Sequence, residues 1–284
     1  MTPASMRNSR WRQSLPTNLV LIIISTIAGL FFVLPLLWFI FAPFNERATL
    51  SVVIPEQFSL ENFREVLSND LAMRGLLQNS PIIGVGVMLA TTLSAALAAY
   101  GLSRSNLPGR QIWTYILILF SSVVTGTASM VPIFRLLNDL RLTDSHLGVI
   151  LAMTGGMIPS AIFIMQDFVE SVPRSYEEAA MVAGASPLQI FRDITFPTMR
   201  PGLMVVGIWV LVNAWGGFLT PFILLRTPEL LPAAVTFYSF YDDEGIPQIT
   251  LVAAYAILYT LPVLLLYLLI NWRYGFRFFG GIKQ

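Results

Sequence analysis

Few side chains in this sequence could carry out chemistry by themselves. The chain has no cysteine, so disulfides, thiolate metal sites and cysteine nucleophiles are excluded. It has one histidine, His146, and one lysine, Lys283. A P-loop needs a lysine beside its glycines to reach the nucleotide phosphates, and Lys283 follows no such loop. We therefore expect no enzymatic activity, no metal site and no bound cofactor in this chain.

One segment, 173–197, carries strong signals for two short helices. Ser175 with Glu178 three residues later fits a capping box, and the alanines after it favour helix. Gly184 suits a left-handed helix stop. Ser186–Gln189 begins a second helix with another capping box and a proline at its first position. The expectation is a helix–turn–helix whose Ala179, Ala180 and Ala183 let another surface approach closely.

The composition indicates which environment positions these residues. Of 284 residues, 55% are hydrophobic and 12% are charged, and the mean hydropathy is +0.70. A soluble domain carries about 25% charged residues. The sequence therefore indicates an integral membrane protein and argues against a soluble enzyme. The net charge of +1 and the absence of a basic tail give no sign of nucleic-acid binding.

Charge-free windows locate the membrane spans, because a charge at the centre of a membrane helix costs about 2.5–3.5 kcal/mol. Six windows reach the ~20 residues that a span needs. They are Gln13–Asn45, Gly75–Ser103, Gln111–Phe134, Leu147–Gln166, Pro201–Leu225 and Gly245–Trp272. We therefore predict an all-α integral membrane fold with six transmembrane helices. Its parts are an N-terminal segment (1–12), the transmembrane domain (13–272) and a C-terminal tail (273–284).

The arginines predict the orientation. If the N-terminus is cytoplasmic, the inner segments hold 11 Lys and Arg and 5 Asp and Glu, whereas the outer ones hold 6 and 11. Both termini are then cytoplasmic, and the helix–turn–helix lies in the longest inner loop, 167–200. The first window exceeds the apolar core of a cleavable signal peptide, so we expect an uncleaved span. An outer stretch, Phe58–Phe63, suggests a short folded element.

The inner loop admits three interpretations. It could be a re-entrant connector that packs only on its own bundle, in which case Glu178 merely caps its helix. It could be a DNA-binding helix–turn–helix, although its 3 arginines face 5 acids and the membrane tethers both its ends. It could also be a docking element for a partner protein.

The loop resembles the EAA loop of binding-protein-dependent ABC importer permeases. The matching residues are Glu178, Ala179, Ala180, Gly184, Ile194 and Pro197. Phe196 stands where the family usually has leucine, and Ala183 where it often has aspartate. Three further segments are similar to carbohydrate-type permeases, the last of them to the MalG-like subunit of maltose-type importers. These are Ala98–Arg104 with Pro108–Arg110, Thr260–Leu264, and Gly280–Gln284.

The resemblance implies a type I (MetI/MalG-like) importer permease in a bacterial or archaeal cytoplasmic membrane. The implied partners are a second permease subunit, two ATP-binding subunits that hold ATP and Mg²⁺, and an extracytoplasmic binding protein that delivers a sugar. The EAA helix would dock in a cleft of the ATPase, where its glutamate pairs with a basic residue. The implied docking residues are Glu177, Glu178, Ala179, Ala180, Gly184 and Pro187.

Residues that line the translocation pathway are harder to predict. Asn213 and Trp215 are candidates, because sugars bind through polar groups and aromatic faces. Ser122 and Thr125 belong to a hydroxyl cluster in the third window, although such residues more often serve close packing. The alternative function is a stand-alone secondary carrier. Carriers usually place ionisable groups within their spans, and the six windows contain none.

Overall fold

The computed structural model describes most of the chain. The described residues are 15–45, 55, 58–105, 108–109, 112–113, 115–116, 119 and 127–274. Within them the regular structure is helical, apart from one isolated bridge between Tyr241 and Pro247, so the predicted all-α class is confirmed. The chain forms two compact units, one of 1–66 with 240–261 and one of 67–239 with 262–284.

Four helices of the described chain are long and apolar enough to cross a membrane. The qualifying stretches are Leu19–Phe44, Asp70–Arg104, His146–Glu170 and Ile249–Leu269. They correspond to α1 (Leu15–Phe41), α4 (Ser80–Arg104) with the turns before it, α7 (His146–Glu170) and α14 (Ile249–Tyr274). The first, second, fourth and sixth predicted spans are therefore helical.

The fifth window, Pro201–Leu225, is not one continuous helix. α11 (Arg200–Trp215) has 16 residues, about 24 Å, and ends before Gly216 and Gly217. α12 (Leu219–Leu224) then begins separately. The helical stretch that precedes α11 meets it at a bend of 72°, and the two together could form a fifth span. A lack of charge marks membrane depth but does not ensure an unbroken helix. Since 11 of the 24 residues of the third window lie outside the described residues, the count of six stays a prediction.

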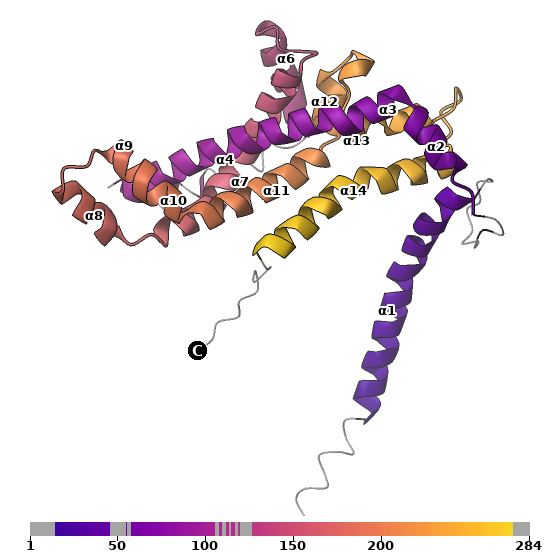
Figure 1. The fold of residues 1–284 in the computed structure, drawn as a ribbon, viewed down its shortest axis with the longest axis horizontal. Helices are drawn as coiled ribbons and strands as arrows, with labels where there is room; N and C mark the ends of the chain where they lie inside the picture. The colour runs from indigo at the N-terminus through magenta and orange to yellow at the C-terminus, as the bar shows by residue number, and fades with distance from the viewer. Residues whose placement is uncertain are drawn as a thin grey trace, which may run out of the picture. The chain divides into compact units, whose positions relative to one another are not determined.

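The larger unit is built on α4, α7 and α11, which run side by side (Figure 1). Valines from all three helices are fully buried between them, including Val87, Val149 and Val206. At Gly202 a β-carbon would collide with the ring of Phe168, so α11 approaches α7 more closely than any other residue would allow. This packed block supports a different set of short elements at each end of α4.

Short helices occupy the two ends of the block. Next to the start of α4 lie α3 (Asp70–Arg74), the π-helical turn η2 (Gly75–Asn79), η5 (Pro228–Leu230) and α13 (Ala233–Thr236), and η6 (Phe237–Phe240) follows α13 in the chain. At its other end lie α8 (Arg174–Val182), α9 (Pro187–Ile190), the π-helical turn η4 (Phe191–Thr195) and α10 (Phe196–Thr198). η3 (Thr127–Ser129) and α6 (Met130–Asp139) precede α7 in the chain.

The smaller unit contains the folded element predicted near Phe58. Here η1 (Ala42–Phe44) follows α1, and α2 is Glu61–Ser68. The side-chain amide nitrogen of Asn62, Nδ2, donates to the backbone carbonyls of Pro43 and Asn45 at 2.8 Å each. The Phe44 ring packs against those of Phe58 and Phe63, so this element is held by both hydrogen bonds and aromatic contacts.

Replacing Gly148 by alanine is expected to destabilise the start of α7. The hydroxyl of Ser145 accepts from the Gly148 amide at 3.1 Å, and a β-carbon on Gly148 would collide with the Leu142 carbonyl. Relieving such overpacking costs about 1–3 kcal/mol, which tryptophan fluorescence during thermal unfolding would report. Gly155→Ala is the matched control in the same helix, because its β-carbon would meet open space. Equal melting temperatures for the two variants would contradict this packing.

Candidate functional site

The first half of the inner loop folds around a start point different from the predicted one. α8 begins at Arg174, and Pro173 takes the N-cap position with φ −61° and ψ 128°. No side chain caps this helix, so the predicted capping box at Ser175 is wrong. Proline fixes φ near −65°, and the ψ of 128° places Pro173 in an extended conformation, so the helix starts directly after it.

The second half of the loop folds as predicted. Gly184 has φ +87°, and the amide of Ala185 donates to the Ala180 carbonyl across this turn. The hydroxyl of Ser186 accepts from the Gln189 amide at 3.4 Å, and the Gln189 side chain accepts from the Ser186 amide at 2.8 Å. This is the second capping box, with Pro187 opening α9. The predicted helix–turn–helix is confirmed.

A buried ion pair attaches α8 to α4. The Arg104 Nε donates to both carboxylate oxygens of Glu177 at 2.9 Å, and its Nη2 lies 2.8 Å from Oε1. The hydroxyl of Thr195 donates to the same Oε1 at 3.1 Å. The side chains of Glu177 and Arg104 are 7% and 14% exposed. We call Arg104, Glu177 and Thr195 the brace, because they connect α4, α8 and η4.

The same arginine also binds the end of α7. Its Nη2 donates to the carbonyls of Val169 and Val172 at 3.1 and 3.0 Å. In the reverse direction, Nη2 of Arg174 donates to the Ser103 carbonyl at 3.2 Å. A planar guanidinium has enough fixed donors to serve a carboxylate and two carbonyls together, which a lysine ammonium could not match in this geometry.

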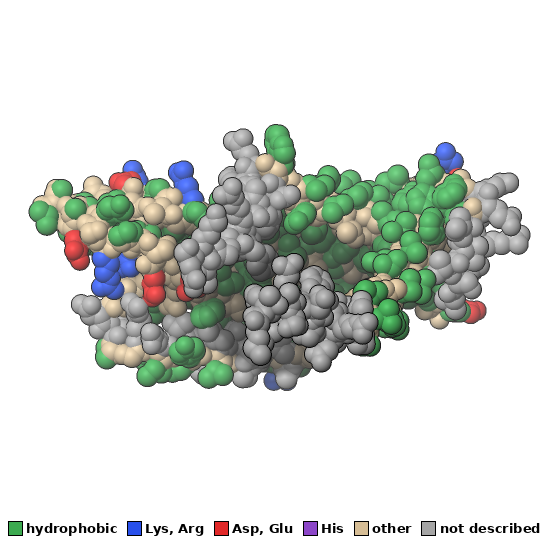
Figure 2. Space-filling model, turned by 90° about the horizontal axis from the view of Figure 1, so that it is seen from below, with side chains coloured by type: hydrophobic (Ala, Val, Ile, Leu, Met, Phe, Trp, Pro, Cys, Tyr) green, Lys and Arg blue, Asp and Glu red, His purple; other side chains and the backbone are tan. Residues whose placement is uncertain are grey.

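Five of the six predicted docking residues are accessible. Glu178, Ala179, Gly184 and Pro187 are exposed and Ala180 is half-buried, whereas Glu177 is buried in the brace. Figure 2 shows acidic and basic side chains gathered at the end of the molecule where α8 and α9 lie. Apolar side chains are exposed there too, and Val182 at 91% is the extreme case. The loop thus offers a mixed charged and apolar surface that suits a protein partner.

The pathway candidates separate in the structure. A cavity of about 650 Å³ lies among α6, α7, α11 and α12, and Asn213 lines it. The side-chain amide nitrogen of Asn213 donates to the Trp209 carbonyl at 2.7 Å, so one of its polar groups is satisfied within the helix. Trp215 is buried and is not among the residues that line this cavity. Ser122 and Thr125 lie outside the described residues.

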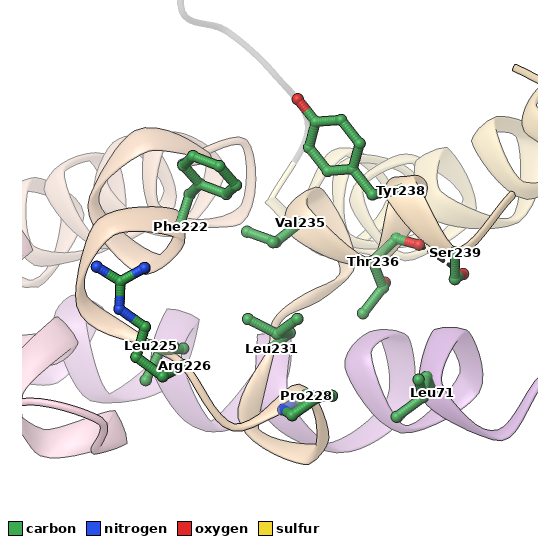
Figure 3. A pocket seen from close by; sticks show the side chains of 10 residues that line it. All are labelled: Leu71, Phe222, Leu225, Arg226, Pro228, Leu231, Val235, Thr236, Tyr238 and Ser239. Carbon is green, nitrogen blue, oxygen red and sulfur yellow. Dashed lines mark hydrogen bonds between the residues drawn. The ribbon is translucent and has the colours of Figure 1, made fainter. Parts of the chain in front are cut away.

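A second cavity, of about 410 Å³, lies beside the start of α4, at the end away from α8 and α9 (Figure 3). Leu231 and Val235 lie between Arg226 and Phe222 on one side and Tyr238 on the other. The rings of Phe218 and Phe222 stack at 5.0 Å, and Tyr238 lies 6.0 Å from Phe222. This cavity is mainly apolar and presents one guanidinium, that of Arg226.

Asp144 supports the segment beside this cavity. Its carboxylate accepts from the Arg226 amide, the Thr227 amide and the Thr227 hydroxyl at 2.8, 2.9 and 2.6 Å. The hydroxyl bond first, and then the two amides, hold the pKa of Asp144 below its ordinary value. The loop before α7 is thereby tied to the segment after α12.

Asp144→Asn is expected to lower stability at neutral pH by about 1 kcal/mol, because the amide is a weaker acceptor than the carboxylate. Because the folded-state pKa of Asp144 is lowered, its carboxylate stabilises the fold at pH values above the ordinary aspartate pKa of about 3.9. This contribution to the free energy of unfolding is lost as the pH falls through the folded-state pKa. The melting temperatures of wild type and Asp144→Asn should therefore differ at pH 7, and the difference should shrink as pH falls below about 3.9 and through the lowered folded-state pKa. A gap that did not depend on pH would show that the charge is irrelevant.

Arg104 and Thr195 are site residues that the sequence patterns did not predict. One available signal was that Arg104 is the first charge after the second window. No group of three or more His, Asp or Glu side chains that could hold a metal ion occurs among the described residues.

Comparison with known proteins places the chain in a transport family. Residues 2–275 match the family described as the binding-protein-dependent transport system inner membrane component. The chain is 27% identical over 272 residues to the galactooligosaccharides transport system permease protein GanQ of Bacillus subtilis, covering 94% of each chain. It is 30% identical over 210 residues to the maltodextrin transport system permease protein MdxG of the same species, covering 74% of this chain and 75% of that one.

A further relative and a solved structure agree with this match. The trehalose transport system permease protein SugB of Mycobacterium tuberculosis is 28% identical over 257 residues, covering 88% of this chain and 92% of that one. The fold is similar to a chain in the crystal structure of a bacterial ABC transporter involved in the import of the acidic polysaccharide alginate. The TM-score is 0.77 at 20% identity, covering 93% of this chain and 98% of that chain.

Proposed function

The chain belongs to the family of binding-protein-dependent transport system inner membrane components, and we propose that it helps to form the pathway for a sugar. It is a permease subunit of an ABC importer, not a stand-alone secondary carrier. The names of three relatives, for galactooligosaccharides, maltodextrin and trehalose, support a mono-, di- or oligosaccharide as solute.

We propose the following division of labour. A second permease subunit completes the pathway, and a binding protein delivers the sugar from outside the membrane. Two ATP-binding subunits hold ATP and Mg²⁺ and dock on α8 and α9 at the inner face. The N- and C-termini lie in the cytoplasm, as the excess of arginine in the inner segments suggests.

The observation that carries this proposal is the α8–α9 loop. It stands at one end of α4, α7 and α11 and leaves Glu178, Ala179 and Gly184 exposed. Truncating a charge that is buried on complex formation has large energetic effects, so an exposed glutamate on such a surface can anchor a partner. The chain has no P-loop lysine, so hydrolysis is assigned to the partners.

The test is to tag this chain, extract it from its native membrane in mild detergent and identify what co-purifies by mass spectrometry. We expect an ATP-binding subunit, a second multi-span protein and a binding protein. A tagged membrane protein of unrelated function controls for adventitious capture. A chain that came out alone and still moved solute in vesicles would overturn the proposal.

A further inference from the structure

We propose that Glu177 is a positioning residue, which makes α8 move as one body with α4 and α7. The brace would pass a displacement of the α8–α9 loop, driven by the docked ATPase, into the transmembrane block. This inference rests on the proposed function, but it assigns Glu177 an internal role rather than a place on the docking surface.

The direction of the two neighbouring glutamates supports this distinction. Successive residues of a helix point about 100° apart, so Glu177 and Glu178 cannot share one face. The Glu177 carboxylate points inward and accepts from Arg104 and Thr195. The Glu178 side chain is exposed. The inner carboxylate is therefore unavailable to a partner unless the brace opens.

The brace is also the main attachment of α8. Glu177 is the one buried residue of this helix, and Tyr176, Met181 and Val182 all expose their side chains. An apolar face that packed on the block would have held α8 by burial, but this helix lacks one. The ion pair to Arg104, together with the bond from Arg174 to the Ser103 carbonyl, therefore connects α8 to α4.

Arg104 passes this connection on to a second helix. Its Nη2 binds the carbonyls of Val169 and Val172, at and just beyond the last turn of α7, while its Nε binds Glu177. Because α4 and α7 pack closely along their length, a displacement of Arg104 is transmitted to both helices. Thr195 adds the start of the path into α10 and α11.

The experiment measures whether α8 follows α4 when ATP is trapped. The complete transporter is purified through a tag on this chain with its co-purifying subunits. Since the chain has no cysteine, spin labels within it attach only at introduced Tyr176→Cys and Leu97→Cys, where the native side chains are 60% and 58% exposed. The distance between the labels is measured by double electron–electron resonance without nucleotide and after trapping with ATP, Mg²⁺ and vanadate.

In the otherwise unchanged labelled chain the mean label distance should be the same in both states. In Glu177→Gln it should shift on trapping by more than the width of the wild-type distribution, while the amount of co-purified ATPase stays within about twofold. The control is Asp193→Asn, an exposed acid in η4 that should behave as wild type. A role in static stability alone would not produce a shift that depends on nucleotide.

Three results would decide against the inference. A constant distance in Glu177→Gln would show that the brace is not needed, and loss of the ATPase from this variant would make Glu177 a docking group. Labels at Leu97→Cys and Phe163→Cys report the distance between α4 and α7. If this distance also increases in Glu177→Gln, the fold of that variant is damaged, and in place of Glu177→Gln the test is repeated with Thr195→Val. That variant should give a smaller shift in the same direction, and no shift would again overturn the inference. If no ATPase accompanies the wild-type chain, the proposed function itself has failed.

Discussion

Arg104→Met is expected to lower the free energy of unfolding by about 3–5 kcal/mol, because it leaves the Glu177 carboxylate buried without its charged partner. The carbonyls of Val169 and Val172 also lose a donor. For a chain of this size, 1 kcal/mol corresponds to about 2–4 °C, so the melting temperature should fall by about 6–20 °C. Tryptophan fluorescence of the purified chain would report the transition.

Two further variants separate charge burial from loss of packing. Arg104→Met combined with Glu177→Met buries no charge and should be more stable than Arg104→Met alone. Arg64→Met removes the exposed ion pair between Arg64 and Glu61, 3.0 Å long, and should cost less than about 1 kcal/mol. If the double variant melted at or below the single one, the unpaired carboxylate would not be the cause.

Glu178→Ala is expected to weaken association with the ATP-binding subunits by about 30-fold or more. Truncating one partner of a buried interfacial charge pair costs about 2 kcal/mol or more, which corresponds to that factor. Glu178 is exposed in this chain, so its removal should leave insertion and the melting temperature nearly unchanged. The measurement is the fraction of ATP-binding subunit retained on the tagged chain over a dilution series.

An exposed acid outside the loop provides the control for this measurement. Glu244 lies in the exposed turn 241–247, and Glu244→Ala should retain the ATP-binding subunits as wild type does. If the Glu178→Ala chain binds the ATP-binding subunits as strongly as wild type does, Glu178 contributes only to its own helix and not to the interface. The docking role would then be refuted, although the family assignment would remain.

The sequence alone establishes those features that depend on local chemistry. The cost of burying charge identified α1, α4, α7 and α14, because each charge-free window is long enough to cross the hydrocarbon core of a membrane. The turn at Gly184 and the cap at Ser186 were predictable since both involve backbone conformation and partners within a few residues. The EAA pattern likewise identified the family before any contact was known.

Local chemistry fails where the side on which a helix packs decides the outcome. Asn213 lines a cavity and Trp215, about 200° further round the same helix, is buried. The break after Trp215 occurs within a window whose composition is uniformly uncharged. The different environments of Asn213 and Trp215 and the break after Trp215 are therefore not determined by the residues next to them in the sequence.

The same reason separates the two adjacent glutamates of α8. The sequence requires them to point in different directions, but either one could have faced the block. The choice depends on Arg104, 73 residues away, whose guanidinium reaches Glu177 only after α4 and α7 have packed. Burial of that pair turns one acid into part of the framework and leaves the other for a partner, and only the tertiary structure makes this choice.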